Sequence, residues 1–161
     1  MKNKKIVYKY KDFIKVEKFF LQKKKIANFH RIKLLDGCMV LVTFKDEILI
    51  LKEFRAAFNN YTYGLPGGLI DNKETPTQCI KREMLEEVGI KAKKLKKIFR
   101  YKRNGNYDCG SDIIFHYTAQ NKTIFLEKDV KHKWIKPKKI INMIRKDQFK
   151  TPGVVAALLF F

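Results

Sequence analysis

The strongest constraint in the sequence is one helix whose two ends are both marked by capping residues. Thr75 is suited to the N-cap position, Pro76 to the first helical position, and Gln78 stands three residues after the cap. Gly89 can adopt the left-handed conformation that stops a helix at its C-terminus. These signals predict a helix over about 76–88.

Three glutamates lie on this helix at a spacing that brings their side chains together. Glu83, Glu86 and Glu87 stand at i, i+3 and i+4, which places them on one helical face. Like charges so placed repel each other, but a hard divalent cation among the carboxylate oxygens makes the arrangement favourable. The spacing therefore predicts a metal site.

The surroundings of the glutamates predict where the metal would lie. Ile80, Met84 and Val88 form an apolar stripe roughly 100° around the helix from the carboxylates, so the metal face should border the core beside a cleft. Before the helix, Gly67 and Gly68 allow the backbone to come close to a ligand, and a main-chain carbonyl there is a further candidate ligand.

Two further charged residues flank the carboxylates. Arg82 neighbours the cluster, and Glu74 comes directly before the N-cap. An ion pair between them would hold the preceding loop on the helix, which is a structural role.

Together these residues resemble the signature of the Nudix hydrolase family, G-x5-E-x7-R-E-U-x-E-E-x-G-U, in which U is a bulky aliphatic residue. The resemblance implies an α/β/α sandwich in which a loop-helix-loop motif binds Mg2+ or Mn2+. It implies attack of metal-activated water on phosphorus, without a covalent enzyme intermediate. On this resemblance Glu83, Glu86 and Glu87 are metal ligands and catalytic residues, and the Gly67 carbonyl is a further ligand. The signature positions are Gly68, Glu74, Arg82, Glu83, Met84, Glu86, Glu87, Gly89 and Ile90.

The rest of the chain predicts several strands and two short helices, without a regular alternation of strand and helix. This pattern is typical of an α+β fold with a mixed sheet. We expect strands within 5–24, 27–33, 38–44, 48–51, 61–63, 92–101, 112–119 and 133–135, and helices at 137–144 and 152–161.

The residues outside the helix indicate the substrate. A strand that ends in Phe54-Arg55, followed after a short loop by Tyr63-Gly-Leu-Pro-Gly-Gly68, resembles the ADP-ribose pyrophosphatase branch of the family. The resemblance implies that Arg55 contacts substrate phosphate. That branch usually carries a glutamate general base after Ser-Asp, whereas Ser111-Asp112 is here followed by Ile113, so Asp112 or Asp108 is the substitute candidate.

The N-terminal strands resemble the arm that ADP-ribose pyrophosphatases exchange in a homodimer. We therefore expect one Nudix domain over 1–161, in which residues 1–35 form a strand arm against a partner chain. The length fits a single domain.

The net charge of +20 predicts an anionic ligand. Because 30 of the 36 basic residues are lysines spread along the chain, a solvated surface that steers anions is favoured over a nucleic-acid surface, which stays possible. Cys38, Cys79 and Cys109 are far apart and form no C-x-x-C motif, which indicates reduced thiols and a cytoplasmic protein. We expect no signal peptide and no membrane partner.

The sequence thus predicts a metal-dependent hydrolase of a nucleoside diphosphate derivative, with ADP-ribose or a related nucleotide sugar favoured. Other Nudix substrates stay open, namely nucleoside triphosphates, dinucleoside polyphosphates and RNA 5′ ends. A non-catalytic nucleotide-binding module is a third alternative, although its carboxylate cluster would be expected to be damaged, and here it is intact.

Overall fold

The structure, a computed structural model, describes residues 2–12, 14–71, 73–103, 105, 107–125 and 130–161. The strands are β1 (Lys2–Tyr10), β2 (Ile14–Leu21), β3 (Ile26–Leu34), β4 (Gly37–Phe44), β5 (Glu47–Arg55), β6 (Asn60–Gly64), β7 (Gly67–Leu69), β8 (Lys96–Lys102), β9 (Ser111–Thr118) and β10 (Lys131–Ile135). The helices are α1 (Pro76–Val88), α2 (Pro137–Arg145) and α3 (Pro152–Leu158), with short 3-10 turns at Gln22–Lys24 and Ala56–Phe58.

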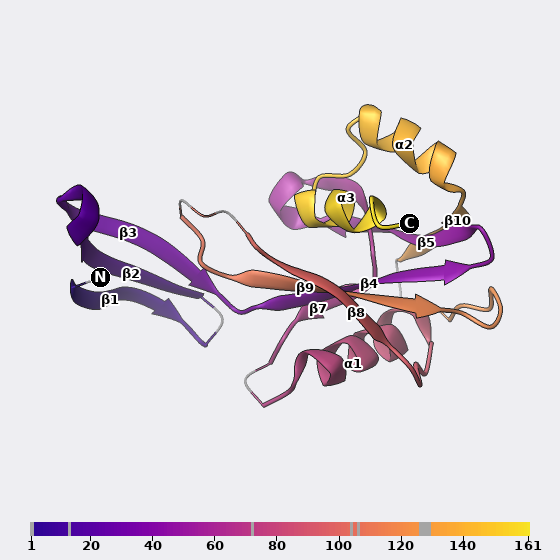
Figure 1. Cartoon of the computed structure of the whole chain (residues 1–161), viewed down its shortest axis with the longest axis horizontal. Helices are drawn as coiled ribbons and strands as arrows, with labels where there is room; N and C mark the ends of the chain where they lie inside the picture. The colour runs from indigo at the N-terminus through magenta and orange to yellow at the C-terminus, as the bar shows by residue number, and fades with distance from the viewer. Residues whose placement is uncertain (1, 13, 72, 104, 106, 126–129) are drawn as a thin grey trace.

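A mixed sheet forms the middle layer of the molecule. Its main path runs β10-β5-β4-β9-β8, with β6 paired to β5 and β7 paired to β4. The β4–β9 pair is parallel and the other pairs are antiparallel. Helix α1 covers one face, and α2 and α3 cover the other (Figure 1). The predicted α+β class with α/β/α layering is confirmed.

Alternating side chains of the central strands divide the core into two halves. On β4, Val40 and Val42 pack toward α1, whereas Leu41 packs toward α2 and α3. The same alternation on β9 sends Ile113 toward α1 and Ile114 toward the other two helices. A residue's position along a strand therefore decides which layer its side chain faces.

The N-terminal strands form a separate three-stranded sheet, in the order β1-β2-β3, which projects from the central layers (Figure 1). It is tied to the β8–β9 loop through Ile32, whose N–H donates to the Tyr107 carbonyl at 2.6 Å and whose carbonyl accepts from the Cys109 N–H at 3.2 Å. Several apolar side chains of β1 are about half exposed, including those of Ile6 and Tyr8.

Most element bounds follow the sequence prediction, with larger differences at four places. Strand β5, predicted over 48–51, continues to Arg55, because β6 pairs with it from Leu51 to Arg55. The strand predicted over 92–101 begins only at Lys96, and Ala92 lies buried in the α1 half of the core before it. Helix α3 ends at Leu158 rather than at residue 161. The glycine-rich turn includes a strand, β7, since its backbone pairs with β4 from Gly37 to Met39.

No helix within the described part of the chain is both long enough and apolar enough to cross a membrane.

Candidate active site

Helix α1 has the ends that its sequence predicts. The Thr75 hydroxyl accepts from the Gln78 N–H at 3.3 Å, while the Gln78 side-chain oxygen accepts from the Thr75 N–H at 2.8 Å, which completes a capping box. Gly89 stops the helix with a φ of 68°. Cys79, Ile80, Met84 and Val88 are fully buried, so the predicted apolar stripe fixes the rotation of the helix and hence the direction of its glutamates.

Glu87 rests against the backbone of β7. Its Oε2 accepts a hydrogen bond from the Gly67 N–H at 2.8 Å. Gly67 has a φ of 152°, and a Cβ there would overlap the Cys38 carbonyl of β4. Only glycine allows this close approach of β7 to β4, which in turn presents the N–H to the carboxylate.

Glu83 lies beside the next glycine, where a Cβ on Gly68 would overlap its carboxylate. One Nη atom of Arg82 lies 2.8 Å from Glu83 Oε1 and 3.0 Å from Glu86 Oε2, while the other lies 2.8 Å from Glu74 Oε1. The predicted ion pair between Glu74 and Arg82 is thus present. Arg82 joins the loop before the helix to two of the three glutamates.

Burial makes the ionised forms of Glu83 and Glu87 unfavourable. Burial, with the negative charges of Glu53 and Glu83 adding to it, raises the pKa of Glu87 to about 8. The pKa of Glu83 is raised as well, first by burial, although Arg82 opposes the shift. A buried carboxylate is costly to ionise unless a cation lies nearby.

The three glutamates suit a hard divalent cation, because carboxylate oxygens are preferred ligands of Mg2+. A bound cation would also offset the repulsion between their negative charges. The glutamates are not already gathered as a ligand set: among the described residues, no three His, Cys, Asp or Glu side chains meet at one point. The reason is visible in their contacts, because Glu86 is 55% exposed and turned to Arg82, while Glu87 is turned to Gly67.

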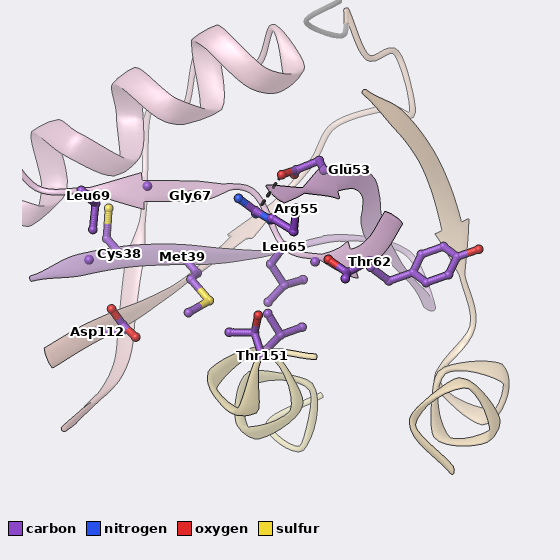
Figure 2. Close-up of a pocket in the computed structure, with 15 residues that line it drawn as sticks. Cys38, Met39, Glu53, Arg55, Thr62, Leu65, Gly67, Leu69, Asp112 and Thr151 are labelled. Carbon is purple, nitrogen blue, oxygen red and sulfur yellow. Dashed lines mark ion pairs between the residues drawn. The ribbon is translucent and has the colours of Figure 1, made fainter. Parts of the chain in front are cut away.

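A cavity of about 550 Å³ opens beside β7, and Gly67 and Gly68 form part of its wall. Arg55 and Glu53 also line it and form an ion pair of 2.8 Å (Figure 2). Both side chains lie on the α1 side of β5, since residues 49 and 51 of that strand pack in the α1 half of the core. The predicted Arg55 thus lines the cavity from the side of the sheet that is covered by α1, the helix that carries Glu87.

Sequence reasoning missed Glu53. Its only signal was the two-residue spacing to Arg55, which puts both side chains on one face of a strand. That spacing could have marked Glu53 as a neighbour of whatever Arg55 binds.

Asp112 lines the same cavity from the opposite face of the sheet. Its neighbour Ile113 packs toward α1, so Asp112 points toward α3. Its Oδ2 accepts from the Tyr101 hydroxyl at 2.6 Å and its Oδ1 from Arg103 at 2.8 Å. Arg103 also donates to Asp108 at 2.8 Å, and Asp108 is not among the residues that line the cavity.

Comparisons with known proteins agree with this architecture. The crystal structure of an ADP compounds hydrolase is similar with a TM-score of 0.78 and 18% identity, over 98% of this chain and 88% of that one. A structure of MutT, from a study of the Aliivibrio salmonicida and Vibrio cholerae proteins, is similar with a TM-score of 0.62 and 19% identity, over 80% of this chain and 99% of that one.

Among curated proteins, an ADP-ribose pyrophosphatase of Bacillus subtilis is 28% identical over 90 residues, which are 56% of this chain. The aligned part spans about half (48%) of that protein's length. Residues 34–157 match the family model described as the NUDIX domain, and the match begins where β3 ends. The predicted membership of the Nudix hydrolase family is confirmed, and the chain belongs to the NUDIX domain family.

Proposed function

We propose that this protein is a metal-dependent hydrolase that cleaves the diphosphate linkage of ADP-ribose or a related nucleotide sugar. One observation carries the proposal: a single cavity is lined by Arg55 and by Gly67, and the Gly67 N–H donates to Glu87, which lies behind the wall on the same side of the sheet as Arg55. The guanidinium of Arg55 suits a diphosphate, and the carboxylates behind Gly67 and Gly68 suit a metal bound to it.

We propose Glu83, Glu86, Glu87 and the Gly67 carbonyl as the groups that hold Mg2+ or Mn2+. When bound, the cation would supply activation of water and neutralisation of phosphoryl charge. The raised pKa of Glu87, caused first by burial, supports this assignment, since a cation would compensate for ionising the carboxylate there. Arg82 and Glu74 hold the loop and helix in place, while Gly68 and Gly89 allow the backbone path.

Arg55 is proposed to bind a substrate phosphate. The guanidinium presents several N–H donors in a plane, which match phosphate oxygens in geometry and charge. Glu53 receives one Nη atom of Arg55 at 2.8 Å and thereby holds the side chain at the cavity. We propose Glu53 as a positioning residue that acts through Arg55.

The residue that takes the proton from water has two proposed candidates outside the helix. Asp112 is the candidate from the sequence, and it lines the cavity, but Tyr101 and Arg103 occupy both of its oxygens. Glu53 is 15% exposed and lies on the same side of the sheet as Glu87. Substitution of each residue separates the two assignments.

The substrate proposal is supported by the ADP-ribose pyrophosphatase of Bacillus subtilis, which is similar over part of its length. The decisive experiment is a hydrolysis panel in Mg2+ and then Mn2+, with ADP-ribose, other nucleotide sugars, nucleoside triphosphates, dinucleoside polyphosphates and 5′-triphosphorylated RNA. We expect AMP and ribose 5-phosphate from ADP-ribose at the highest kcat/KM. A higher kcat/KM for a triphosphate or for RNA would refute the substrate, and no metal-dependent turnover of any compound would refute the reaction.

We also propose that the chain acts as a homodimer in the cytoplasm, with residues 1–35 against a partner chain. The half-exposed Ile6 and Tyr8 on β1 support an arm that packs on another surface. Light scattering at micromolar protein should give the dimer mass. The double variant Ile6→Ser, Tyr8→Ser should shift it toward the monomer, whereas Ile141→Ser on α2 should not. A wild-type monomer would contradict the proposal.

A further inference from the structure

A second cavity lies at the far end of the central sheet from the candidate active site. It has about 1030 Å³ of space and lies between the segment that follows α1 and the end of β9. Asp112, near the start of β9, lines the first cavity, whereas Thr118, at its end, lines the second. Six residues of strand separate them by roughly 20 Å. We call it the lysine cavity, after the four lysines among its main lining residues: Lys91, Lys93, Lys94, Lys96, His116 and Tyr117.

The lysine cavity concentrates positive charge without an acidic partner. No aspartate or glutamate is among its described lining residues, and none of its four exposed lysines forms a salt bridge with any residue that the structure describes. Lysines nearby behave differently, since Lys122 is paired with Glu47 and Lys136 with Asp46. Four like charges around one hollow repel one another, and a bound anion would offset that repulsion.

His116 lines the lysine cavity beside these positive charges. Its Nε2 is 2.9 Å from the Thr43 hydroxyl, and its backbone pairs with that of Lys96 on β8. Burial and then the charge of Lys96 lower the pKa of His116 below its usual value. Its imidazole is therefore neutral at neutral pH, and its ring signals will respond to an anion that enters the cavity.

The chemistry of the wall indicates the class of anion. All four cations are lysines, which bind phosphate as point charges, and no arginine, whose fork reads base edges, is among the described residues that line the cavity. Tyr117 also lines the cavity; its ring packs partly against the α1 half of the core, and bases of a single strand stack on the exposed part of such rings without sequence preference. We infer that the lysine cavity binds the phosphate backbone of a single-stranded nucleic acid, independently of its sequence and apart from the hydrolytic site.

Binding at the lysine cavity would give a specific use to part of the +20 charge. Lysines occur along the whole chain, but four of the six residues from Lys91 to Lys96 are lysines, and the fold places this local cluster around one hollow at the open β8 edge of the sheet. The proposed binding of nucleic acid does not rest on the proposed function, because it is tested by binding and not by hydrolysis.

The test measures fluorescence anisotropy of a labelled, mixed-sequence single-stranded RNA oligonucleotide over a range of KCl concentrations. The triple variant Lys91→Gln, Lys93→Gln, Lys94→Gln should bind about tenfold more weakly near physiological salt. Its log–log salt slope should be shallower by about 2, at roughly 0.7 for each lost phosphate contact on a single strand. Its hydrolytic kcat/KM should stay at the wild-type value.

The matched control removes the same three charges elsewhere. Lys138, Lys139 and Lys146 are exposed residues of α2 and its C-cap, in the layer opposite α1, and Lys→Gln at all three should weaken RNA binding less than about twofold. In NMR spectra of the wild type, RNA should shift the ring signals of His116 and raise its pKa, while those of His30 stay unchanged.

Three outcomes would overturn the inference. Equal weakening by the two triple variants would mean that general charge attracts the RNA. Stronger binding to anionic phospholipid vesicles than to RNA, lost in the cavity variant alone, would make the partner a membrane surface. Displacement of the RNA by inorganic phosphate at equal phosphate concentration would make the ligand a free anion.

Discussion

The two walls of the candidate active site are built in different ways. The box side, residues 67–89, is specified within one stretch of sequence, where caps, apolar stripe and carboxylates succeed one another. The flank side, Glu53, Arg55 and Asp112, comes from strands β5 and β9, which meet only through the sheet. The groups proposed to bind the metal ion, which activates water, therefore follow from one continuous segment of sequence. The groups proposed to contact the substrate come together only when the strands pair in the fold. Substitutions on each side should therefore affect different kinetic constants.

The largest effect is expected on the box side. Glu87→Gln should lower kcat by on the order of a thousandfold, because a metal ligand supplies several kcal/mol of transition-state stabilisation. Glu86→Gln should lower kcat in the same direction. Since burial raises the pKa of Glu87 to about 8, its ionised form costs stability at neutral pH, so Glu87→Gln should not lower the thermal midpoint.

Steady-state kinetics in saturating Mg2+ and calorimetry check this prediction. The control is Lys81→Gln, an exposed position on the same helix, which should leave both kcat and the thermal midpoint unchanged. Wild-type turnover in both glutamate variants would remove the metal assignment from α1.

On the flank side, Arg55→Gln should act mainly on KM. Loss of a charged hydrogen bond to phosphate should raise KM for ADP-ribose about tenfold, with a smaller change in kcat. Arg55 is half exposed, but it is an ion-pair partner of Glu53, which is only 15% exposed, so its loss should also lower the thermal midpoint. Inhibition of ADP-ribose hydrolysis by inorganic pyrophosphate, measured for wild type and variant, shows whether the lost contact is to the diphosphate. A fall in kcat at constant KM would show instead that both walls act in the chemical step.

Single substitutions of Glu53 and of Asp112 distinguish the roles of these two residues on the flank side. Glu53→Gln should raise KM several-fold, in the same direction as Arg55→Gln, because Arg55 loses its charged partner. Asp112→Asn should instead lower stability by about 1–3 kcal/mol, since the part-buried Arg103 loses a charged acceptor. Asp108→Asn is the control that also removes a partner of Arg103, but outside the cavity.

Kinetics and thermal unfolding of these three variants decide between the candidate bases. If Asp112→Asn lowers kcat about a hundredfold and abolishes the acidic limb of the pH–rate profile while Asp108→Asn does neither, Asp112 is the base. If Glu53→Gln removes that limb, the role belongs to Glu53.

The same contrast explains which features the sequence could predict. Thr75, Pro76, Gln78 and Gly89 act on their own helix, so the bounds of α1 follow from local chemistry. The position of Asp112 does not, because only the parallel pairing of β4 with β9 decides which face it occupies. Strand β7 was missed for a related reason: it exists through its register with β4, which no pattern within its own three residues reveals.

The smallest effect concerns the ion pair that anchors the box side. Hydrogen bonds from Arg82 lower the pKa of Glu74 to about 2, from an ordinary value near 4.5. A carboxyl with a lowered folded pKa stabilises the fold above its unfolded pKa, and that stability is lost as the pH falls through the folded value. Glu74→Gln should therefore cost up to about 1 kcal/mol at neutral pH, or about 2–4 °C in the thermal midpoint.

The difference between wild type and Glu74→Gln should shrink as the pH falls from about 4.5 and vanish near pH 2, as measured by urea unfolding. Glutamine can still accept from the Asp71 N–H, so the loop keeps its hydrogen bond and only the charge is removed. The matched control is Glu47→Gln, whose ion pair with Lys122 lies outside the box and should change stability without changing kcat. A constant stability difference across this pH range would show that Glu74 contributes by its shape and hydrogen bond alone, and the box side would then be held by packing rather than by charge.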